Sequence, residues 1–508
     1  MVQEIFAHNG YFVDQIPSCF STESLALAFD DLLFYPKLAK SFNIKNIKTY
    51  PIELSVYKES FLRRTLSFPN ILAYIKLLQE LANTFNEYEH LISSPNSESK
   101  ANILTTFDYN SNYRKSIMER NRKFCGNKYK LSIDISNCYS SIYSHSIIWA
   151  MLGKDKAKNM ALGKEEKNTL YTKFEKIDRY NARLKYSETN GLVIGPYSSR
   201  IISEIILGAI DKILSDKKYE FSRFVDDYNF YFTSKYDAER AIGEIASILN
   251  QFNLKINESK IKIEKYPFDI LDDYSNYFKQ SLNNKYPIYD ILQKASLLEQ
   301  QGKKGSYKYA FKMLKQDVKL RGVDYEEVLN LFYTLISIIV NRPMMARYAV
   351  EMISSFGISF SKNEMVDKLN ELLAKEIDEH HDQEVLWLLY VILKYGAKIT
   401  CENVCAILNK SNDFAKMMIL DMLNGHRKLI LNYTENSSKF NNRIKKEVMN
   451  LDKELNGENL LTKRWFLIYE INIYNFNMYG AFKNLKLKDN TYSVLKKSNV
   501  NFYKSIFD

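Results

Sequence analysis

The chain has few cysteines for its length and no pattern that would connect them. There are five in 508 residues, and the closest pair, Cys401 and Cys405, has no second pair with which to bind zinc. We therefore expect neither a disulfide framework nor a zinc site. Reduced thiols are typical of an intracellular compartment, so a cytoplasmic protein is expected.

Two further absences concern the membrane. The N-terminal sequence MVQEIFAHNGYF has neither the basic region nor the apolar core of a signal peptide. The longest apolar stretch, Val328 to Val340, is too short to span a bilayer and is interrupted by polar side chains. This stretch predicts a buried helix, and no membrane partner is expected.

What the chain does have is length, positive charge and aromatic residues. With 508 residues it is too long for one core, so two or more domains are expected. The net charge of +11 suits a polyanionic partner such as nucleic acid, with a lysine-rich solubilising surface as the alternative. The 37 tyrosines and 30 phenylalanines suit the stacking of single-stranded bases, although most of these rings must form the core.

Helical and strand periodicities alternate in the first half. Residues 20–90 predict helices, because apolar residues recur at spacings of three and four. KLSIDI (residues 130–135) alternates apolar and polar side chains, which predicts a strand. FSRFVDDYNFYF (residues 221–232) predicts a β-hairpin. Because strand signals continue to about residue 265, the first half is expected to be α+β.

Helical patterns alone continue from about residue 286. Gly357 and Gly396 each end a predicted helix four residues before a capping residue, Ser361 or Thr400. The two glycines are 39 residues apart, close to the period of two-helix solenoid repeats. We predict an α+β domain at residues 1–285 and an all-α domain at 286–508. The second domain is either a HEAT-like repeat or an irregular bundle.

Three aspartate residues suggest a metal site. The chain contains three Asp-Asp pairs, Asp30-Asp31, Asp226-Asp227 and Asp272-Asp273. Only the middle pair lies between two aromatic, strand-forming arms, and it follows a strand that ends near Asp134. Nucleotidyl transfer needs two divalent ions about 3.5–4 Å apart, and carboxylates are their preferred ligands. Asp134, Asp226 and Asp227 are therefore predicted to hold two Mg²⁺ ions, or Mn²⁺, with Ile135 as a further metal-binding position.

Four segments resemble the motifs of reverse transcriptases. In chain order they are DISNCY (134–139), GLVIGPYSSR (191–200), RFVDDY (223–228) and LKINESK (254–260). The resemblance implies a fingers and palm fold and a nucleotidyltransferase, a DNA polymerase of that family. One position departs from the family, since Ile194 stands where a glutamine usually precedes the glycine. This departure bears on template handling, because the second motif faces the template and the incoming nucleotide.

The resemblance also implies nucleotide-binding residues. Tyr139 matches the steric gate, whose ring would clash with a 2′-hydroxyl, so dNTPs are the expected substrates; a core tyrosine is the alternative. Gly195 and Lys260 match the glycine of the second motif and the lysine of the fourth. Arg63 and Arg64 resemble the paired arginines of the fingers and would grip the triphosphate. The basic run between residues 114 and 130 is the alternative for that role.

Flanking segments narrow the resemblance to bacterial reverse transcriptases of phage defence, and to the abortive-infection (Abi) group above all. They are GYFVDQIPSCF (10–20), RRTLSFPNILAY (63–74), SIYSHSIIWAMLGK (141–154) and RW at Arg464-Trp465. The resemblance implies a HEAT-like second half, a homo-oligomer (trimer or hexamer) and DNA synthesis without a template. It also implies a tyrosine primer and a single-stranded DNA product that stays covalently attached. Tyr11 is the first candidate for that primer, ahead of Tyr35 and Tyr50.

Two other functions remain open. One is a conventional RNA-templated reverse transcriptase of a bacterial retroelement, and the other is a catalytically silent scaffold whose helical half binds a partner. The three aspartates argue against the scaffold. The absence of RNase H, integrase, maturase and endonuclease signatures argues against the retroelement enzyme.

Overall fold

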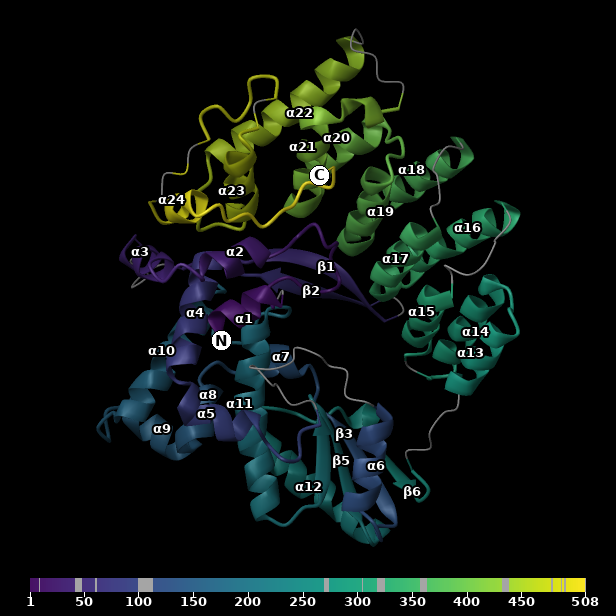
Figure 1. Cartoon of the computed structure of the whole chain (residues 1–508). Coiled ribbons are helices and arrows are strands. Elements are labelled where there is room, and N and C mark those ends of the chain that lie inside the picture. Colours follow the sequence, from purple (N-terminus) through teal and green to yellow (C-terminus); the bar gives the residue numbers. More distant parts are fainter. Residues whose placement is uncertain are drawn as a thin grey trace.

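The first half of the chain contains all the described strands, and the second half is built from helices (Figure 1). The computed structural model describes residues 1–8, 10–41, 48–59, 62–98, 113–268, 274–303, 305–317, 325–356, 363–431, 438–476, 478–485, 487 and 490–507. Within these ranges, every element after residue 265 is helical. The predicted fold class, an α+β half followed by an all-α half, is confirmed.

The palm of the first half is a four-stranded antiparallel sheet with strand order β4-β5-β3-β6. Its strands are β3 (Tyr129–Asp134), β4 (Phe221–Phe224), β5 (Asp227–Phe232) and β6 (Lys262–Lys265). Helix α12 (Lys235–Gln251) packs on β3 and β5, where it buries its apolar side from Ala238 to Leu249. The strand at 130–135 and the hairpin at 221–232 are confirmed.

A second, two-stranded sheet was not predicted. Residues 20–90 contain the expected helices, but also β1 (Ile52–Glu59) and β2 (Leu62–Phe68), which pair antiparallel. The helical interpretation was wrong at this point because Ile52, Leu54 and Val56 alternate with polar residues and are buried on one face. This hairpin, called the β1–β2 hairpin below, lies between the palm and the second half (Figure 1).

Helices surround both sheets in the first half. Those before the palm are α1 (Val2–Ala7), α2 (Glu23–Ala28), α3 (Phe34–Ser41), α4 (Ile71–Asn83), α5 (Phe85–Ile92) and α6 (Tyr113–Lys123). Between β3 and β4 lie α7 (Cys138–Ser141), α8 (Ser146–Leu152), α9 (Lys154–Ala161), α10 (Thr169–Arg183) and α11 (Tyr197–Asp216). A short 3-10 helix, η2 (Glu258–Lys260), precedes β6. Helix α11 is buried along most of its length, so it forms the centre of this half.

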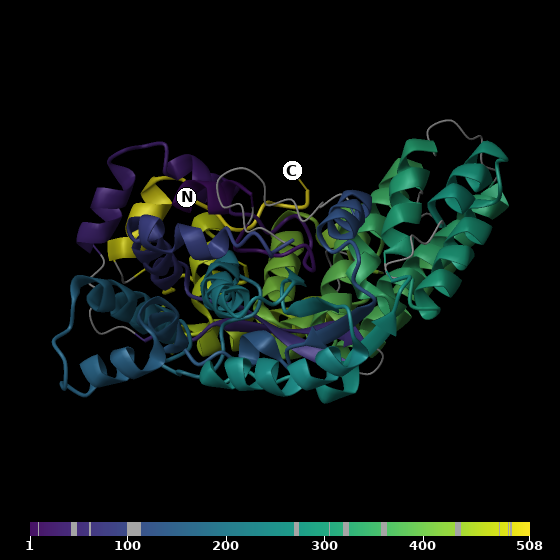
Figure 2. The ribbon, with the colours of Figure 1, turned by 90° about the horizontal axis from the view of Figure 1, so that it is seen from below.

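The second half is a row of helix pairs. Its helices are α13 (Tyr274–Asn283), α14 (Ile288–Gln300), α15 (Ser306–Asp317), α16 (Tyr325–Asn341), α17 (Ala346–Phe356), α18 (Asn363–Asp378), α19 (Asp382–Lys394), α20 (Cys401–Lys410), α21 (Asp413–Gly425), α22 (Ser438–Asn456), α23 (Trp465–Tyr474) and α24 (Asn490–Lys497). Short 3-10 turns lie at Pro343–Met345 and Arg427–Leu429. Pairs stack on pairs, since α18 packs on α20 and α19 on α21. Figure 2 shows the teal and green helices extending to one side of the molecule.

The second of the two predicted repeat boundaries, at Gly396 and Thr400, is present in the structure. Gly396 follows α19 with a φ of 67°, and the Thr400 side chain caps α20 by accepting a hydrogen bond from the Asn403 N–H at 3.2 Å. The equivalent Gly357 and Ser361 lie outside the described residues. Stacked helix pairs with these boundaries agree with the HEAT-like prediction.

Aromatic side chains join the two halves. Phe414 on α21 contacts Phe12, Phe20 and Phe68 of the first half, with ring centroids 4.9–6.0 Å apart. Phe466 on α23 extends this cluster. The chain ends also meet, because Phe20 forms a β-bridge with Tyr503. The halves therefore share one core.

Along the described part of the chain, no single helix is both long and apolar enough to cross a bilayer. Residues Val328–Asn341 and Pro343–Ser355 together meet the length and composition criteria, with a bend of 119° between them.

Candidate active site

The three predicted aspartates meet at one end of the palm sheet. Asp134 ends β3 and lies directly opposite Asp227 at the start of β5. Directly opposed antiparallel residues have Cα atoms about 4.5–5.5 Å apart, so both side chains emerge on one face. The Ile135 N–H donates to the Asp226 carbonyl at 3.3 Å, which brings the third aspartate to the same edge. The structure thus brings together residues more than ninety positions apart in the sequence.

Asp226 lies in a tight turn with an unusual residue beside it. Phe224 pairs with Asp227, so Val225 and Asp226 form the two-residue tip of the β4–β5 hairpin. Val225 has a φ of 57°, a left-handed conformation that β-branched residues rarely adopt. Such strain persists only where surrounding contacts fix the backbone.

A buried arginine supplies one of those contacts. Arg223 is fully buried, and its Nη1 donates to the Val225 carbonyl at 2.9 Å. Two acids of α11 neutralise it, since its Nη2 lies 3.0 Å from Glu204 and 2.9 Å from Asp211. The Tyr228 hydroxyl also donates to Asp211 at 3.1 Å. This charged network therefore holds the turn from behind.

Sequence reasoning missed this network, although a signal for it exists. Glu204 and Asp211 are seven residues apart on a largely buried helix, so they share one face. Arg223 likewise lies on the same strand face as buried Phe221, two residues before it. Buried charges are rare unless they are paired, so these three positions could have been matched to one another.

The aspartates crowd one another electrostatically. Loss of water raises the pKa of Asp227 to about 6, and the hydrogen bond with Asp134 and the charge of Asp226 add to the shift. Desolvation, followed by repulsion from Asp134, also raises the pKa of Asp226. Solvent around the exposed Asp227 screens part of this repulsion. Carboxylates that repel one another in this way form a site that favours cations.

Lys260 and Asn257 occupy the side of Asp134 that faces the open cavity. Lys260 Nζ and Asn257 Nδ2 each lie 3.2 Å from Asp134 Oδ2. Burial lowers the pKa of Lys260, but the hydrogen bond to Asp134 and the charges of Asp227 and Asp226 outweigh it, so the pKa rises. The prediction placed Lys260 near the nucleotide, and the structure brings it to the aspartates.

A cavity opens over this edge of the sheet. It has a volume of about 540 Å³, and its walls include Asp134, Asp227, Asn229, Ser259 and Lys260. This volume lies within the range of small-ligand sites, about 300–1,000 Å³. Carboxylate oxygens with an ammonium group beside them suit divalent ions and a polyphosphate. Ile135 is buried at 1% exposure, so only its backbone carbonyl could serve as a ligand.

Tyr139 is hydrogen-bonded to the loop that carries Gly195, and neither residue is among the walls of this cavity. Tyr139 is half-buried on α7, where its carbonyl accepts the Leu192 N–H at 2.8 Å and its hydroxyl accepts from Ser203 at 3.5 Å. Gly195 has a φ of 130°, a conformation that only glycine adopts readily. The glycine loop lies along β2, because the Ser67 N–H donates to the Ile194 carbonyl at 2.8 Å. The steric gate role of Tyr139 stays a prediction.

The paired arginines point in different directions. Arg63 lies with Glu384 of α19, its Nη1 and Nη2 donating at 2.9 and 2.7 Å. Arg64 lies on the opposite face of β2, the face of Leu66, which contacts the Gly195 position. Burial lowers the pKa of Arg64, and its Nε is buried with no hydrogen-bond partner among the described residues. Arg64, and not Arg63, therefore shares a strand face with the residue that lies against Gly195.

The candidate primer tyrosines differ in exposure. Tyr11 is fully buried, its hydroxyl donates to the Pro69 carbonyl, and burial raises its pKa well above the usual range. Tyr35 is partly buried, which also raises its pKa. Tyr50 is 46% exposed, and its ring stacks on Tyr186 with centroids 4.3 Å apart. Of the three, Tyr50 is the most accessible.

Of the other aspartate pairs, the one at Asp30-Asp31 does not join the site. Asp30 and Asp31 lie in the turn between α2 and α3, where Asp31 accepts the Leu33 N–H at 2.8 Å. Asp272 and Asp273 lie outside the described residues. Residues 114–123 of the basic run belong to α6, and Arg120 there pairs with Glu98 at 2.6 Å.

Comparisons with known proteins bear on this geometry. Residues 72–274 match the family model "Reverse transcriptase (RNA-dependent DNA polymerase)". No curated protein matches the chain.

Three solved structures of telomerase resemble parts of the chain, at TM-scores too low to support any argument. Telomerase from Candida albicans with a fragment of telomeric RNA is 14% identical, with 72% of this chain and 68% of that chain covered and a TM-score of 0.29. The corresponding complex from Candida tropicalis is 12% identical, with 73% and 68% covered and a TM-score of 0.33. The apo enzyme from that species is 13% identical, with 71% and 72% covered and a TM-score of 0.30.

The family match covers the whole palm sheet and all three aspartates. Enzymes of this family use divalent metal ions and bind nucleotides and nucleic acid. Residues 72–274 therefore form a reverse transcriptase domain, and the chain is a nucleotidyltransferase, a DNA polymerase of the reverse transcriptase type.

Proposed function

We propose that this enzyme is a template-independent DNA polymerase, primed by one of its own tyrosines, that acts in abortive-infection defence against phage. The single observation that carries its chemistry is the pairing of Asp134 with Asp227 beside the Asp226 turn. Two Mg²⁺ ions at these carboxylates would activate a hydroxyl nucleophile and support the leaving pyrophosphate. A tyrosine hydroxyl can take the place of a 3′-hydroxyl in this chemistry.

The roles of the surrounding side chains follow from their positions. Asp134, Asp226 and Asp227 hold the metal ions, and Lys260 attracts the phosphates from the open side of the cavity. Arg64 offers an unpaired, partly desolvated guanidinium near the glycine loop, which suits an anionic ligand. Tyr139 sits under the sugar and selects deoxynucleotides.

The segments that carry the Abi resemblance support the rest of the proposal. Phe12 and Phe20 of the first segment and Phe68 of the second meet around Phe414 at the junction of the two halves. Trp465 of the last segment packs on Phe466, which in turn contacts Phe414. The resemblance thus falls on the contact that fixes the helical half against the polymerase. An Abi-like enzyme would also form a trimer or hexamer.

The primer assignment changes in the light of burial. The Tyr11 hydroxyl would have to leave its bond to Pro69 and the core before it could reach a metal. Tyr50 is exposed, so we favour it over Tyr11 and Tyr35.

One experiment separates the three candidate functions. The purified protein is digested and searched by mass spectrometry for DNA on a tyrosine peptide, then incubated with dNTPs and Mg²⁺ without a template. Incorporation without template, with DNA on a tyrosine, supports the proposal. Incorporation only with an added RNA template supports the retroelement enzyme. Absence of incorporation by the wild type, with no change in Asp226→Asn, supports the silent scaffold.

A further inference from the structure

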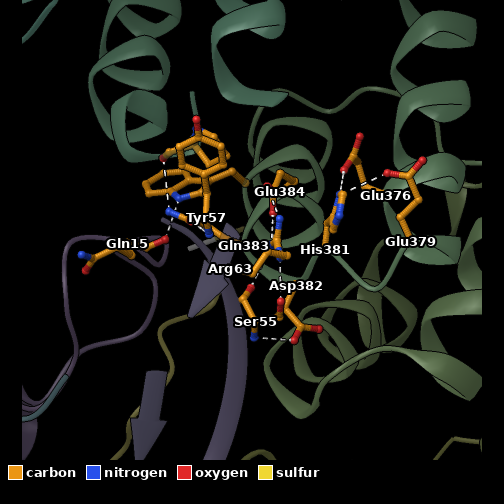
Figure 3. A network of polar contacts seen from close by, with 12 residues as sticks. Gln15, Ser55, Tyr57, Arg63, Glu376, Glu379, His381, Asp382, Gln383 and Glu384 are labelled. Carbon is orange, nitrogen blue, oxygen red and sulfur yellow. Dashed lines mark hydrogen bonds and ion pairs between the residues drawn. The ribbon is translucent and has the colours of Figure 1, made fainter. Parts of the chain in front are cut away.

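Three consecutive side chains at the start of α19 bind the β1–β2 hairpin (Figure 3). Asp382 Oδ2 accepts the Ser55 N–H at 2.8 Å, and Gln383 Oε1 accepts the Tyr57 N–H at 3.0 Å. Glu384 accepts both Nη groups of Arg63. More than 320 residues separate these partners in the sequence, so the contact joins the two halves directly.

These contacts take the place of a third strand. β1 has one hydrogen-bonded neighbour, β2, and residues two apart present their N–H groups along its other edge. Asp382 and Gln383 satisfy two of these donors, at Ser55 and Tyr57. The outer edge of the hairpin is thus fixed by side chains of the helical half and not by another strand.

Arg63 extends the same attachment across the hairpin. Its Nε donates to Ser55 Oγ at 2.7 Å and its Nη2 to the Ser55 carbonyl at 3.1 Å, while its remaining donors bind Glu384. Glu384 is 2% exposed, so the pair is shielded from water and its two parallel hydrogen bonds are strong. Four of the five Arg63 N–H groups are used in this way, so only one, on Nη1, is left for a triphosphate.

The start of α19 is itself held by contacts with three neighbouring parts of the helical row. Asn412 of the next repeat donates to Asp382 Oδ1 at 3.0 Å. Just before the helix, His381 Nδ1 lies 2.6 Å from Glu376 and 3.3 Å from Glu379 (Figure 3). Gln383 Nε2 donates to the Pro343 carbonyl at 3.3 Å. Three neighbouring parts of the helical row therefore orient the residues that bind the hairpin.

We infer that Arg63 is a positioning residue, through which the helical half fixes the β1–β2 hairpin and so aims Arg64 at the nucleotide. Adjacent strand residues face opposite ways, so a contact that fixes Arg63 on one face fixes the direction of Arg64 on the other. The helical half is then part of the nucleotide site and not only a scaffold. This inference rests on the proposed function, because it assigns a partner surface to the same site.

The test uses the full-length protein with Glu384→Gln, Arg63→Glu and the exchanged pair Arg63→Glu/Glu384→Arg. Two quantities are measured: kcat and KM for dNTP incorporation, and hydrogen exchange of the β1–β2 amides by mass spectrometry. Each single variant is expected to raise KM by about 10–100-fold, as small displacements of binding groups do. Exchange of the Ser55 and Tyr57 amides is expected to accelerate, and the exchanged pair should restore both readouts in large part.

Arg347→Ala is the matched control. Arg347 also joins the halves, by a 2.6 Å pair with Asp14, but that pair is exposed, so neither readout should change. If Arg63 itself gripped the triphosphate, Glu384→Gln would keep its KM, and the exchanged pair would be as inactive as Arg63→Glu. That result would overturn the inference.

The amide exchange separates this inference from the proposed function. A wild type without incorporation would refute the function, while faster exchange in Glu384→Gln would still support the attachment. If Glu384→Gln changed neither the amide exchange nor the KM, the attachment would be refuted and the proposed function would stand.

Discussion

The β4–β5 hairpin of the palm and the α19–α21 stack of the helical half have opposite interiors. Behind the palm hairpin, Arg223, Glu204 and Asp211 form a buried charged network. Along the helices, the buried residues from Val385 to Leu393 are all apolar, and those from Phe414 to Leu423 are apolar except for Lys416 and Asp421. The comparison indicates that the palm uses energetically costly buried charges to orient its aspartates. The helical half contributes stability through apolar packing.

The largest effect is expected at the metal site itself. Asp134→Asn should lower dNTP incorporation by about 10³-fold, because it removes one carboxylate from the metal ligands. Folding should be retained, because the change also removes repulsion between Asp134 and Asp227. Asp290→Asn, in the exposed first turn of α14, is the control and should keep full activity. Equal activity of the two variants would show that the aspartate cluster is not catalytic.

The buried network offers the next largest effect. Arg223→Met leaves the buried Asp211 without an ion-pair partner among the described residues and leaves Glu204 paired with Arg200 alone, at a cost of about 3–5 kcal/mol in the free energy of unfolding. Arg443→Met in the helical half breaks an exposed pair with Glu402, and about 0–1 kcal/mol is expected. Urea unfolding of both variants measures the difference. Similar losses would mean that the two regions do not differ in the way described.

The outcome at these residues shows how far the sequence could predict the site. The alternation around Asp134 and the aromatic arms of the hairpin are local patterns, and they predicted the correct strands and the meeting of three aspartates. The repeat boundary at Thr400 was predicted for the same reason, since a cap is a local feature.

Long-range partners could not be predicted in the same way. Arg63 carries the same side chain whether it faces a nucleotide or Glu384, and the two residues are 321 positions apart. Tyr11 looks like any other tyrosine until the core closes around it. The β1 and β2 strands were missed because the helical spacing that begins after them was taken to describe the residues before it as well.

A buried acid in the helical half tests whether its interior is uniformly apolar. Burial raises the pKa of Glu470 on α23 to about 8, although the Phe502 N–H donates to it at 2.8 Å. Above the ordinary pKa of a glutamate, Glu470 is ionised in the unfolded chain but still protonated in the folded protein. The free energy of unfolding therefore falls as the pH rises toward 8.

Glu470→Gln keeps an acceptor for Phe502 but cannot ionise. Relative to wild type, the variant should gain about 2–3 kcal/mol in the free energy of unfolding between pH 6 and pH 9. Denaturant unfolding at both pH values gives this difference. The control is Glu458→Gln, at an exposed position, which should show no such change in its difference from wild type. If the difference between Glu470→Gln and wild type also stayed the same at both pH values, the Glu470 side chain would be ionised in the folded protein.

The smallest effect separates the two regions most directly, because each has one residue at positive φ. At the end of α19 the residue is Gly396, with a φ of 67°, and at the palm turn it is Val225, with a φ of 57°. Gly396→Ala should destabilise the protein by about 1–2 kcal/mol, since a Cβ is disfavoured there. Val225→Gly removes that penalty but adds unfolded-state entropy of about 0.5–1 kcal/mol, so a gain of at most about 1 kcal/mol is expected.

Activity should move in the opposite sense from stability in the palm variant. The glycine frees a turn that Arg223 holds by the Val225 carbonyl, so Asp226 is aimed less accurately and incorporation falls by about tenfold. Gly396→Ala should lose stability and keep its kcat, because Gly396 follows the end of α19 opposite to the residues that bind the β1–β2 hairpin. If Val225→Gly changed neither the stability nor kcat, the strained turn would contribute nothing to catalysis. The difference between the palm and the helical half would then depend on the buried Arg223 network alone.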